Sequence, residues 1–440
     1  MTNGDSRSMR KVAVSALLGT TLEYYDFLLY STMAALVFGQ VFFPGDNPAV
    51  STIAAFGTLA VGYVARPLGG LIFGHFGDRL GRKHILFVTM ALMGAASFLI
   101  GLLPGYATIG IAAPILLVVL RIAQGIAIGG EWGGAALMVV EHSDSDSRGK
   151  WAGIMNLGSP LGFLMATVAV AMVSLLPDEA LYSWGWRVPF LISALLVIVG
   201  IYIRLQIAES PVFEQAAEKA EVSTTRMPLM QVLRRPRTVI LACGAGIAPF
   251  AMTALTTSHI ITYATGIGYA RSTVMQALIV LSLVSLVVIP LASAVSDRVG
   301  RRPVVLTGAV AAVLFAFPLY TLVDSGSVPL MMTGLVLAQV IQNAMFAPLV
   351  PLLSEMFGTS VRYTGASVGY QSASLIGAGF TPLIASSLLV PAGGASWPLS
   401  LIIVVTAAIS ILALALTKET RGLALGSVSQ SGRAMSDSPV

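Results

Sequence analysis

Twelve long apolar runs constrain what this 440-residue chain can fold into more than any other feature. About 20 apolar residues of α-helix are needed to cross roughly 30 Å of hydrocarbon, and each run is of that order. Strands of a membrane barrel would alternate in polarity, and these runs do not. The runs cover residues 14–40, 53–73, 84–103, 111–139, 152–176, 187–206, 238–264, 273–295, 303–323, 328–353, 363–389 and 397–416. We therefore expect an all-α membrane protein with twelve transmembrane helices.

The composition excludes an ordinary soluble domain. Only 10% of the residues are charged and 56% are hydrophobic, whereas a globular domain carries about 25% charged residues. The single cysteine, Cys243, excludes a disulfide scaffold and a cysteine-based metal site. The four histidines show no metal-ligand spacing. We expect no metal, no cofactor and no nucleic-acid partner.

The distribution of Lys and Arg predicts the orientation. If the N-terminus is cytoplasmic, 21 of the 25 basic residues lie in the N-terminal tail, the cytoplasmic loops and the C-terminal tail. Only Arg187 and Arg271 lie in outside loops, while Arg66 and Arg121 lie within helices. The positive-inside rule therefore predicts cytoplasmic termini. The first apolar run has no cleavage-site pattern, so we expect it to be a retained helix.

The two halves of the sequence repeat each other. One long polar stretch, 207–236, separates six apolar runs from six more. A charged motif in the first half recurs 219 positions later, as Asp78-Arg79-x-Gly81-Arg82-Lys83 and Asp297-Arg298-x-Gly300-Arg301-Arg302. We expect a duplicated six-helix unit, an arrangement used by transporters. The predicted divisions are an N-terminal half at 1–206, a central cytoplasmic loop at 207–236, a C-terminal half at 237–416 and a tail at 417–440.

The repeated motif resembles the loop signature of the major facilitator superfamily. The first copy reads Gly74-His-Phe-Gly-Asp78-Arg79-Leu-Gly81-Arg82-Lys83. The second copy has Ser293 in place of the first glycine. This resemblance implies the major facilitator fold, and it implies that the two motifs are gating elements that stabilise the inward-closed state. Positive-inside topology alone would not explain the paired aspartates and glycines.

Within that superfamily the chain resembles the metabolite:proton symporters along nearly its whole length. The segments that carry the resemblance include Glu23-Tyr24-Tyr25-Asp26-Phe27, Arg66-Pro67, Arg121-Ile-Ala-Gln124-Gly125, Gly129-Gly130-Glu131-Trp132-Gly133-Gly134 and Val361-Arg362-Tyr363-Thr364-Gly365. The resemblance implies proton-coupled uptake of a small carboxylate or a zwitterion, such as shikimate, 2-oxoglutarate, proline or betaine. It implies a bacterial-type inner membrane and small-molecule and proton partners, and we expect a monomer in the lipid bilayer.

Two other functions compete with uptake. Export on the same fold is an alternative, although the segment Gly158-Ser159-Pro160-Leu161-Gly162 lacks the Gly-Pro dipeptide of superfamily antiporters. An ATP-driven pump or polytopic enzyme would need a phosphate-binding loop, and none of the five lysines is followed by Ser or Thr. We therefore expect a transporter and not an enzyme.

The charged residues inside the helices are the candidate site residues. Glu23, Asp26 and Tyr30 share one helix face because they are spaced i, i+3 and i+7. Such intramembrane carboxylates are candidates for proton coupling, and ion pairing between helices is the alternative. Arg66 and Arg121 are the complementary cations, since a guanidinium offers a planar fork to a carboxylate. Each arginine could instead neutralise a carboxylate of the protein.

The remaining candidates are uncharged polar groups and one further carboxylate. Gln124 is a further substrate or coupling candidate. Glu131 lies among glycines that would let another helix approach closely, so a packing role is as consistent with the sequence as coupling. Asn343 and Gln371 lie in second-half helices and either line the pocket or hold helices together. The gating candidates are Gly74, Asp78, Arg79, Gly81, Arg82, Asp297, Arg298, Gly300 and Arg301.

Overall fold

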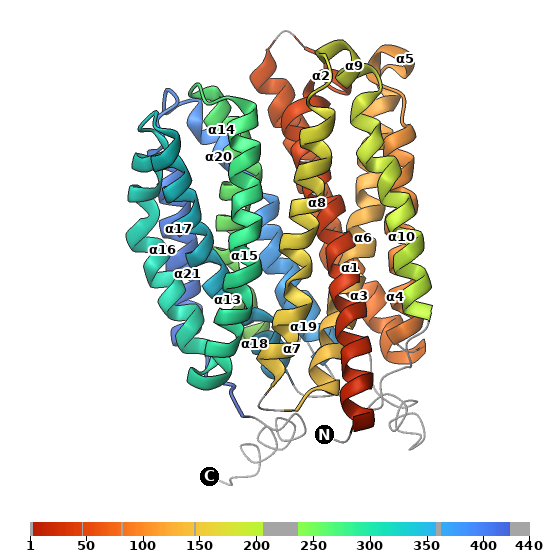
Figure 1. Ribbon diagram of the computed structural model, residues 1–440, viewed down its shortest axis with the longest axis vertical. Helices are drawn as coiled ribbons and strands as arrows, with labels where there is room; N and C mark the ends of the chain where they lie inside the picture. Colours follow the sequence, from red (N-terminus) through yellow and green to blue (C-terminus); the bar gives the residue numbers. More distant parts are fainter. Residues whose placement is uncertain are drawn as a thin grey trace.

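The computed structural model describes residues 3–45, 47–80, 82–144, 147–205, 236–357 and 362–422. Within these ranges, twelve helices are long and apolar enough to cross a membrane. They run side by side in one bundle (Figure 1). The prediction of an all-α protein with twelve membrane helices is confirmed. The spans are Val12–Val41, Val50–Gly74, His84–Leu102, Ala112–His142, Arg148–Val173, Gly185–Tyr202, Pro236–Gly266, Arg271–Val299, Arg301–Val323, Val328–Glu355, Arg362–Leu389 and Trp397–Ala415.

Each half of the chain contributes six of these spans. The first six are built from α1 (Asn3–Met33), η1 (Ala34–Phe38), α2 (Gly39–Val41), α3 (Pro48–Leu80), α4 (Arg82–Leu102), α6 (Ala112–His142), α7 (Arg148–Asn156), α8 (Gly158–Val173), η2 (Gly185–Arg187) and α10 (Val188–Leu205). Short helices α5 (Tyr106–Ile109) and α9 (Asp178–Ser183) lie between spans. The last six are built from α13 (Pro236–Thr253), η4 (Ala254–His259), α14 (Ile260–Gly266), α15 (Arg271–Val299), α16 (Arg301–Val323), α17 (Val328–Phe346), α18 (Leu349–Glu355), α19 (Arg362–Ser374), η6 (Leu375–Gly379), α20 (Thr381–Leu389) and α21 (Trp397–Ala415).

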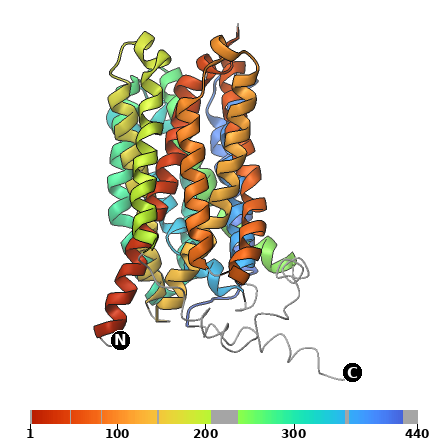
Figure 2. The same ribbon diagram turned by 90° about the vertical axis from the view of Figure 1, so that its right-hand side faces the viewer.

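The helix ends define two faces of the bundle. The end at which α1 begins and α15 ends, at the bottom of Figures 1 and 2, is called the N-terminal face. The end at which α3 begins and α14 ends, at the top, is called the opposite face. Large apolar side chains on the outside of the bundle, such as Leu195 and Leu314, are 64% and 73% exposed. This outer apolar surface is what a bilayer would cover.

Glycines allow the closest helix packing in the N-terminal half. A Cβ at Gly129 of α6 would lie 1.9 Å from the carbonyl oxygen of Arg66 on α3. A Cβ at Gly125 would lie 2.1 Å from the carbonyl oxygen of Gly62. Only residues without a side chain permit this approach, which small-residue stripes provide in membrane helices. The close approach expected from the glycines around Glu131 is therefore present, and it fixes where Arg66 lies.

Three spans are interrupted by π-helical turns, namely η1 in the first span, η4 in the seventh and η6 in the eleventh. The first and seventh spans hold equivalent positions in the two halves. Single π turns within α-helices are frequent at functional sites. Here η4 and η6 lie next to the interface between the halves, beside α1 and α3 respectively.

Several helix ends differ from the predicted ranges. The fifth span begins at Arg148, four residues before the predicted start at 152. Arg148 and Lys150, predicted to lie in a loop, form the first turn of α7. The reason is a cap from the other half, since Asp297 accepts hydrogen bonds from the backbone N–H groups of Gly149 and Lys150. Residues 207–235 of the predicted central loop lie outside the described residues.

Candidate functional site

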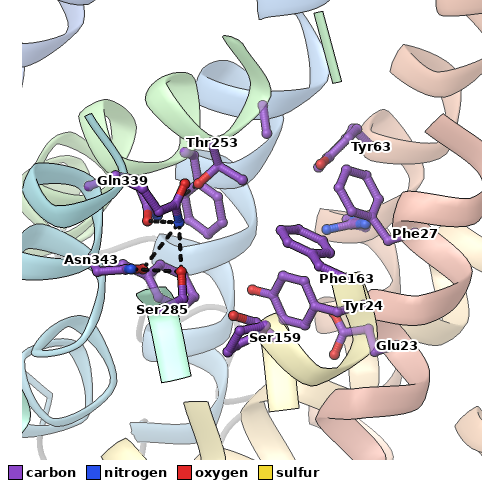
Figure 3. A pocket seen from close by; sticks show the side chains of 16 residues that line it. Glu23, Tyr24, Phe27, Tyr63, Ser159, Phe163, Thr253, Ser285, Gln339 and Asn343 are labelled. Carbon is purple, nitrogen blue, oxygen red and sulfur yellow. Dashed lines mark hydrogen bonds between the residues drawn. The ribbon is translucent and has the colours of Figure 1, made fainter. Parts of the chain in front are cut away.

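A cavity lies between the two halves of the bundle (Figure 3). Its volume is about 30 Å³, which is room for about two water molecules. The side chains that line it come from α1, α3 and α8 on one side and from α13, α15, α17 and η6 on the other. They are Glu23, Tyr24, Phe27, Tyr63, Arg66, Ser159, Pro160, Phe163, Phe250, Thr253, Ser285, Gln339, Gln342, Asn343, Phe346 and Ala378. A metabolite would need these walls to move apart.

Arg66 is the cation of this cavity and is only 6% exposed. Its guanidinium carbon lies 4.1 Å from the ring centroid of Tyr63 and 5.3 Å from that of Phe27. Nη1 donates a hydrogen bond of 3.2 Å to Ser374 Oγ, in the other half. Stacking on two rings holds the planar group without neutralising its charge. Arg66 can therefore attract an anionic group from within the cavity.

Glu23 also lines the cavity, one turn along α1 from Phe27. Its side chain is buried. One candidate carboxylate, Glu23, and one candidate guanidinium, Arg66, therefore both line this cavity.

The C-terminal half gives the cavity a wall of amides and hydroxyls (Figure 3). Gln339 Nε2 donates to Ser285 Oγ at 3.0 Å, and Asn343 Nδ2 donates to the same oxygen at 2.8 Å. Gln342 Nε2 donates to Thr253 Oγ1 at 2.8 Å. Asn343 therefore lines the cavity and also joins α17 to α15, so it combines the two roles that the sequence left open. No charged side chain lines this wall among the described residues, so the two halves present different chemistry.

Aromatic side chains close the cavity toward the N-terminal face. The rings of Trp132 on α6 and Tyr370 on α19 stack with their centroids 3.6 Å apart. The hydroxyls of Tyr370 and Tyr24 lie 3.0 Å apart, which joins α19 to α1. Nearer that face, Tyr363 Oη donates to the carbonyl oxygen of Gly130 at 2.6 Å. These contacts cross between the halves, so a path from the cavity to the N-terminal face requires the halves to separate.

Asp26 and Arg121 lie outside the cavity lining, within the N-terminal half. Two polar side chains connect them. Ser97 Oγ donates to Asp26 Oδ2 at 2.6 Å and accepts from Gln124 Nε2 at 2.6 Å. Arg121 Nη1 donates to Gln124 Oε1 at 3.0 Å. We call this chain of four side chains the Asp26 network.

Tyr30 joins the Asp26 network to α3. The guanidinium carbon of Arg121 lies 4.0 Å from the Tyr30 ring centroid. The Tyr30 hydroxyl lies 2.6 Å from Thr58 Oγ1. Asp26, Arg121 and Gln124 are all at most 2% exposed. The Asp26 network thus links a buried carboxyl to a buried guanidinium within the N-terminal half.

Glu131 and Gln371 lie outside the cavity lining as well, in the packed region between α6 and α19. Both are at most 1% exposed. Among the described residues, neither polar atom of the Gln371 amide has a hydrogen-bond partner. Unsatisfied buried amides are costly in a closed core. The helices α6 and α19, which pack together where the halves meet, therefore each carry a buried polar side chain there, Glu131 and Gln371.

The second copy of the repeated motif joins the halves at the N-terminal face. Asp297 Oδ1 and Oδ2 accept from the backbone nitrogens of Gly149 and Lys150 at 3.0 and 2.8 Å. Arg301 Nη1 lies 2.5 Å from Asp297 Oδ1. Arg298 is exposed and lies in the last turn of α15. Asp297 thus caps a helix of the opposite half, where its charge is favoured by the helix dipole.

Glu355 extends this contact. Its Oε1 lies 3.5 Å from Arg148 Nη1, and its Oε2 lies 3.7 Å from Arg301 Nε. Thr420 Oγ1 donates to Glu355 Oε2 at 2.7 Å. We call Arg148, Asp297, Arg301 and Glu355 the closing cluster.

The first copy of the motif is described only in part. Gly74 is buried, and a Cβ there would lie 3.2 Å from the ring of Tyr363. Asp78 and Arg79 belong to α3 and Arg82 begins α4. The side chains of these three residues, and Gly81 altogether, lie outside the described residues. Gly300 has φ +114 and lies against Glu419, so its position in the motif needs a glycine.

Several residues of these sites were not among the sequence candidates. Tyr63 lies three residues before Arg66 on one helix face, which is a signal that could have found it. Ser97, Ser285 and Ser374 carry no such signal, because isolated serines are common in membrane helices. Glu355 was not among the candidates either, and its partners come from three separate segments.

Comparison with known proteins gives the family. The model of the Sugar (and other) transporter family matches residues 12–231, and that of the Major Facilitator Superfamily matches residues 260–434. The inner membrane metabolite transport protein YhjE of Escherichia coli K12 is 40% identical over 422 residues, which cover 94% of this chain and 95% of that protein. The chain belongs to the major facilitator superfamily, and it is a multi-pass membrane transporter rather than an enzyme.

Other relatives show a range of substrates. The shikimate transporter of Escherichia coli K12 is 40% identical, with 86% of this chain and 88% of that protein covered. The proline/betaine transporter of Salmonella typhimurium LT2 is 35% identical, with 88% and 79% covered. The solved structure of the proton:xylose symporter XylE superposes with a TM-score of 0.77 at 17% identity, covering 97% of this chain and 99% of that one. That structure supports the fold alone.

Proposed function

We propose that this protein is a secondary active transporter that takes up a small carboxylate or zwitterion together with protons, by alternating access. The observation that carries this proposal is Arg66, a buried guanidinium held on aromatic rings inside a cavity that both halves line. A guanidinium binds a carboxylate with two parallel charge-assisted hydrogen bonds. The shikimate and proline/betaine relatives act on molecules that carry this group.

Proton coupling is assigned to the carboxyls of α1. Glu23 lines the cavity beside Arg66, and Asp26 begins the Asp26 network one turn away. Protonation of Glu23 or Asp26 would remove a negative charge near Arg66 and Arg121. Binding of the substrate anion to Arg66 and protonation of α1 would then favour each other, which is the linkage a symporter needs.

The proposed orientation places the N-terminal face in the cytoplasm. Lys and Arg concentrate in the segments on that side, and the positive-inside rule relates such a bias to the cytoplasmic side. The proposed location is a bacterial-type inner membrane, which is where the name of the YhjE relative places that protein. We propose a monomer, because one chain supplies both walls of the cavity.

Uptake into right-side-out vesicles tests the proposal. Labelled shikimate, 2-oxoglutarate, proline and glycine betaine are supplied with and without an imposed inward proton gradient. We expect at least one of them to be concentrated, and only with the gradient. Arg66→Gln should reduce that uptake at least tenfold, since charge-assisted contacts contribute about 1.5–3 kcal/mol.

The matched control is Arg271→Gln, at the first residue of α15 and outside the cavity. It should transport as the unaltered protein does. Equal uptake with and without the inward proton gradient would contradict proton coupling. Equal uptake by Arg66→Gln and the unaltered protein would remove Arg66 from substrate binding.

A further inference from the structure

A second cavity lies between the halves near the opposite face, and the proposed function does not use it. Its volume is about 370 Å³, far larger than the central cavity. Thr52 and Ile53 at the start of α3 form one wall, while η4, α14 and α20 form the rest. The segments α14 and α20 lie at the upper end of the bundle in Figure 1. We call this space the outer cavity.

Three polar groups on the wall of the outer cavity lack a partner among the described residues. They are Nδ1 of His259, Oγ1 of Thr262 and Oγ of Ser386. His259 is only 1% exposed. Each buried polar atom without a hydrogen bond costs about 1–3 kcal/mol, so native proteins seldom leave three together. A ligand with hydrogen-bonding groups in this cavity offers partners of the kind that these three atoms lack.

The outer cavity is separated from the central cavity by a contact between the halves. Ser31 Oγ on α1 donates to Ser258 Oγ on η4 at 2.7 Å, and Ser258 directly precedes His259. Ser258 and His259 both belong to the π-helical turn η4, whose wide backbone can rearrange. His259, which lines the outer cavity, is therefore joined by one peptide bond to Ser258, which closes the path inward.

The lining specifies the chemistry of an occupant. No Asp, Glu, Lys or Arg lines the outer cavity among the described residues. The three unpartnered groups offer hydrogen bonds to hydroxyl or carboxyl oxygens, while Ile53, Ile267 and Leu389 offer an apolar surface. A small molecule with a polar edge of hydroxyl or carboxyl groups and an apolar face fits both. A methylated ammonium has no hydrogen-bonding group for this wall.

We propose that the outer cavity is a second, preliminary binding site for the hydroxylated or carboxylate metabolite that the central cavity transports. His259, Thr262 and Ser386 hold it by hydrogen bonds on the opposite-face side of the Ser31–Ser258 contact. This inference rests on the proposed function for the identity of its occupant. The site itself needs neither Arg66 nor a proton gradient.

Protection of an introduced cysteine tests the outer site in the full-length protein. The reporter is Ile53→Cys in a Cys243→Ala background, with Leu389→Cys as a second reporter on the facing wall. The rate at which the introduced cysteine reacts with a charged methanethiosulfonate reagent is measured in purified protein, with and without saturating shikimate. Shikimate carries both hydroxyls and a carboxylate. Every reporter is also placed in Arg66→Gln, which disables the central site.

We expect shikimate to slow labelling several-fold with either residue at position 66, and tetramethylammonium, which has no hydrogen-bonding group, not to slow it. Thr262→Val combined with Ser386→Ala should raise the half-protecting shikimate concentration about 5- to 50-fold, as two lost hydrogen bonds predict. Thr265→Val is the matched control, because the Thr265 hydroxyl already donates to the carbonyl oxygen of Ile261 at 2.7 Å. It should leave protection unchanged.

Two results would overturn the proposal. Absence of protection would mean that the cavity holds only water. Protection that disappears in Arg66→Gln would mean that the outer cavity merely closes when the central one is filled. Protection without any shikimate uptake by the unaltered chain would keep the outer site and contradict the proposed transport of this molecule.

Discussion

Arg66 and Arg121 are both buried arginines that stack on a tyrosine ring, yet their surroundings give them different roles. Arg66 lies in the cavity and donates to Ser374 of the other half. Arg121 donates to Gln124, which connects through Ser97 to Asp26 in the same half. Under the proposed function, the first guanidinium binds the substrate and the second responds to the charge of a carboxyl.

Asp26→Asn tests whether proton-driven transport depends on the charge of the Asp26 carboxyl. The amide keeps the shape of the side chain and can still accept from Ser97, but it does not titrate. We expect loss of proton-driven accumulation while exchange of labelled for unlabelled substrate continues. Counterflow and gradient-driven uptake in the same vesicles measure the two activities. Undiminished accumulation would remove Asp26 from coupling, and Glu23→Gln would then be the variant to examine.

Arg121→Lys tests whether Arg121 binds substrate directly. Lysine keeps the charge but loses the planar fork and the stacking on Tyr30. Because Arg121 does not line the cavity, we expect the KM for substrate to change less than threefold while the maximal rate of driven uptake falls. Arg66→Lys is the matched comparison and should raise the KM at least tenfold. A larger KM effect at Arg121 than at Arg66 would reverse this assignment.

The candidate residues show what a sequence can predict about a site. The helical spacing placed Glu23, Asp26 and Tyr30 on α1 and identified both arginines, because intramembrane charge is rare enough to be a signal. Spacing along one helix does not say how that helix is rotated against its neighbours. Glycine packing between α3 and α6 sets that rotation, and it is the reason that Arg66 reaches the cavity.

At the scale of single elements, helix interiors follow from apolar length and helix ends follow from partners elsewhere. The predicted start of the fifth span was late because Asp297, far away in the sequence, caps α7. The start of α16 is fixed by another distant carboxylate. Glu419 accepts from the backbone nitrogens of Arg301 and Arg302 at 2.9 and 3.0 Å. Neither cap could be read from residues next to the helix.

Glu419→Gln tests the cap of α16. Burial acts to raise the pKa of Glu419, but backbone N–H groups of Arg301, Arg421, Arg302 and Thr420 outweigh it, and the pKa is lowered. A lowered pKa stabilises the fold above the ordinary glutamate value of about 4.3, and this contribution is lost as the pH falls through the lowered value. We expect a loss of about 1 kcal/mol at pH 7 that shrinks in acid.

Denaturant unfolding of the purified protein at pH 7 and at pH 4 measures that difference. Glu179→Gln, an exposed carboxyl in the first turn of α9, is the control. It should have a smaller effect at both pH values. An equal loss at the two pH values for Glu419→Gln would show that the charge of Glu419 does not stabilise α16.

At the scale of the whole molecule, contacts near both faces hold the halves together, in addition to those beside the central cavity. The closing cluster joins α7 to α15 and α18 at the N-terminal face, while Ser31 and Ser258 meet near the opposite face. The small central cavity agrees with closure on both sides. The duplication predicted equivalent motifs in both halves, but it could not predict that the second motif would contact α7.

Asp297→Asn tests whether the closing cluster controls which face opens. Its two oxygens accept from α7 and its charge attracts Arg301. The amide offers one acceptor and no charge, so Arg301 loses its nearest partner and the closed N-terminal face is destabilised. A loss of about 1–2 kcal/mol shifts the ratio of open to closed molecules roughly five- to thirty-fold. Transport should slow while the order of preferred substrates stays the same.

Single-cysteine accessibility in a Cys243→Ala background measures this shift. Ser293→Cys reports on the N-terminal face, because Ser293 is 1% exposed and lies against Gly153 of α7. Ile53→Cys reports on the opposite face, because Ile53 lines the outer cavity. We expect Asp297→Asn to raise labelling at position 293 and lower it at position 53. Asp324→Asn is the control, because Asp324 accepts from Tyr263 and Ser396 within the C-terminal half alone. Unchanged labelling at position 293, or a changed substrate order, would contradict the gating role, because a contact between the halves at this face has no other route to the rate of transport.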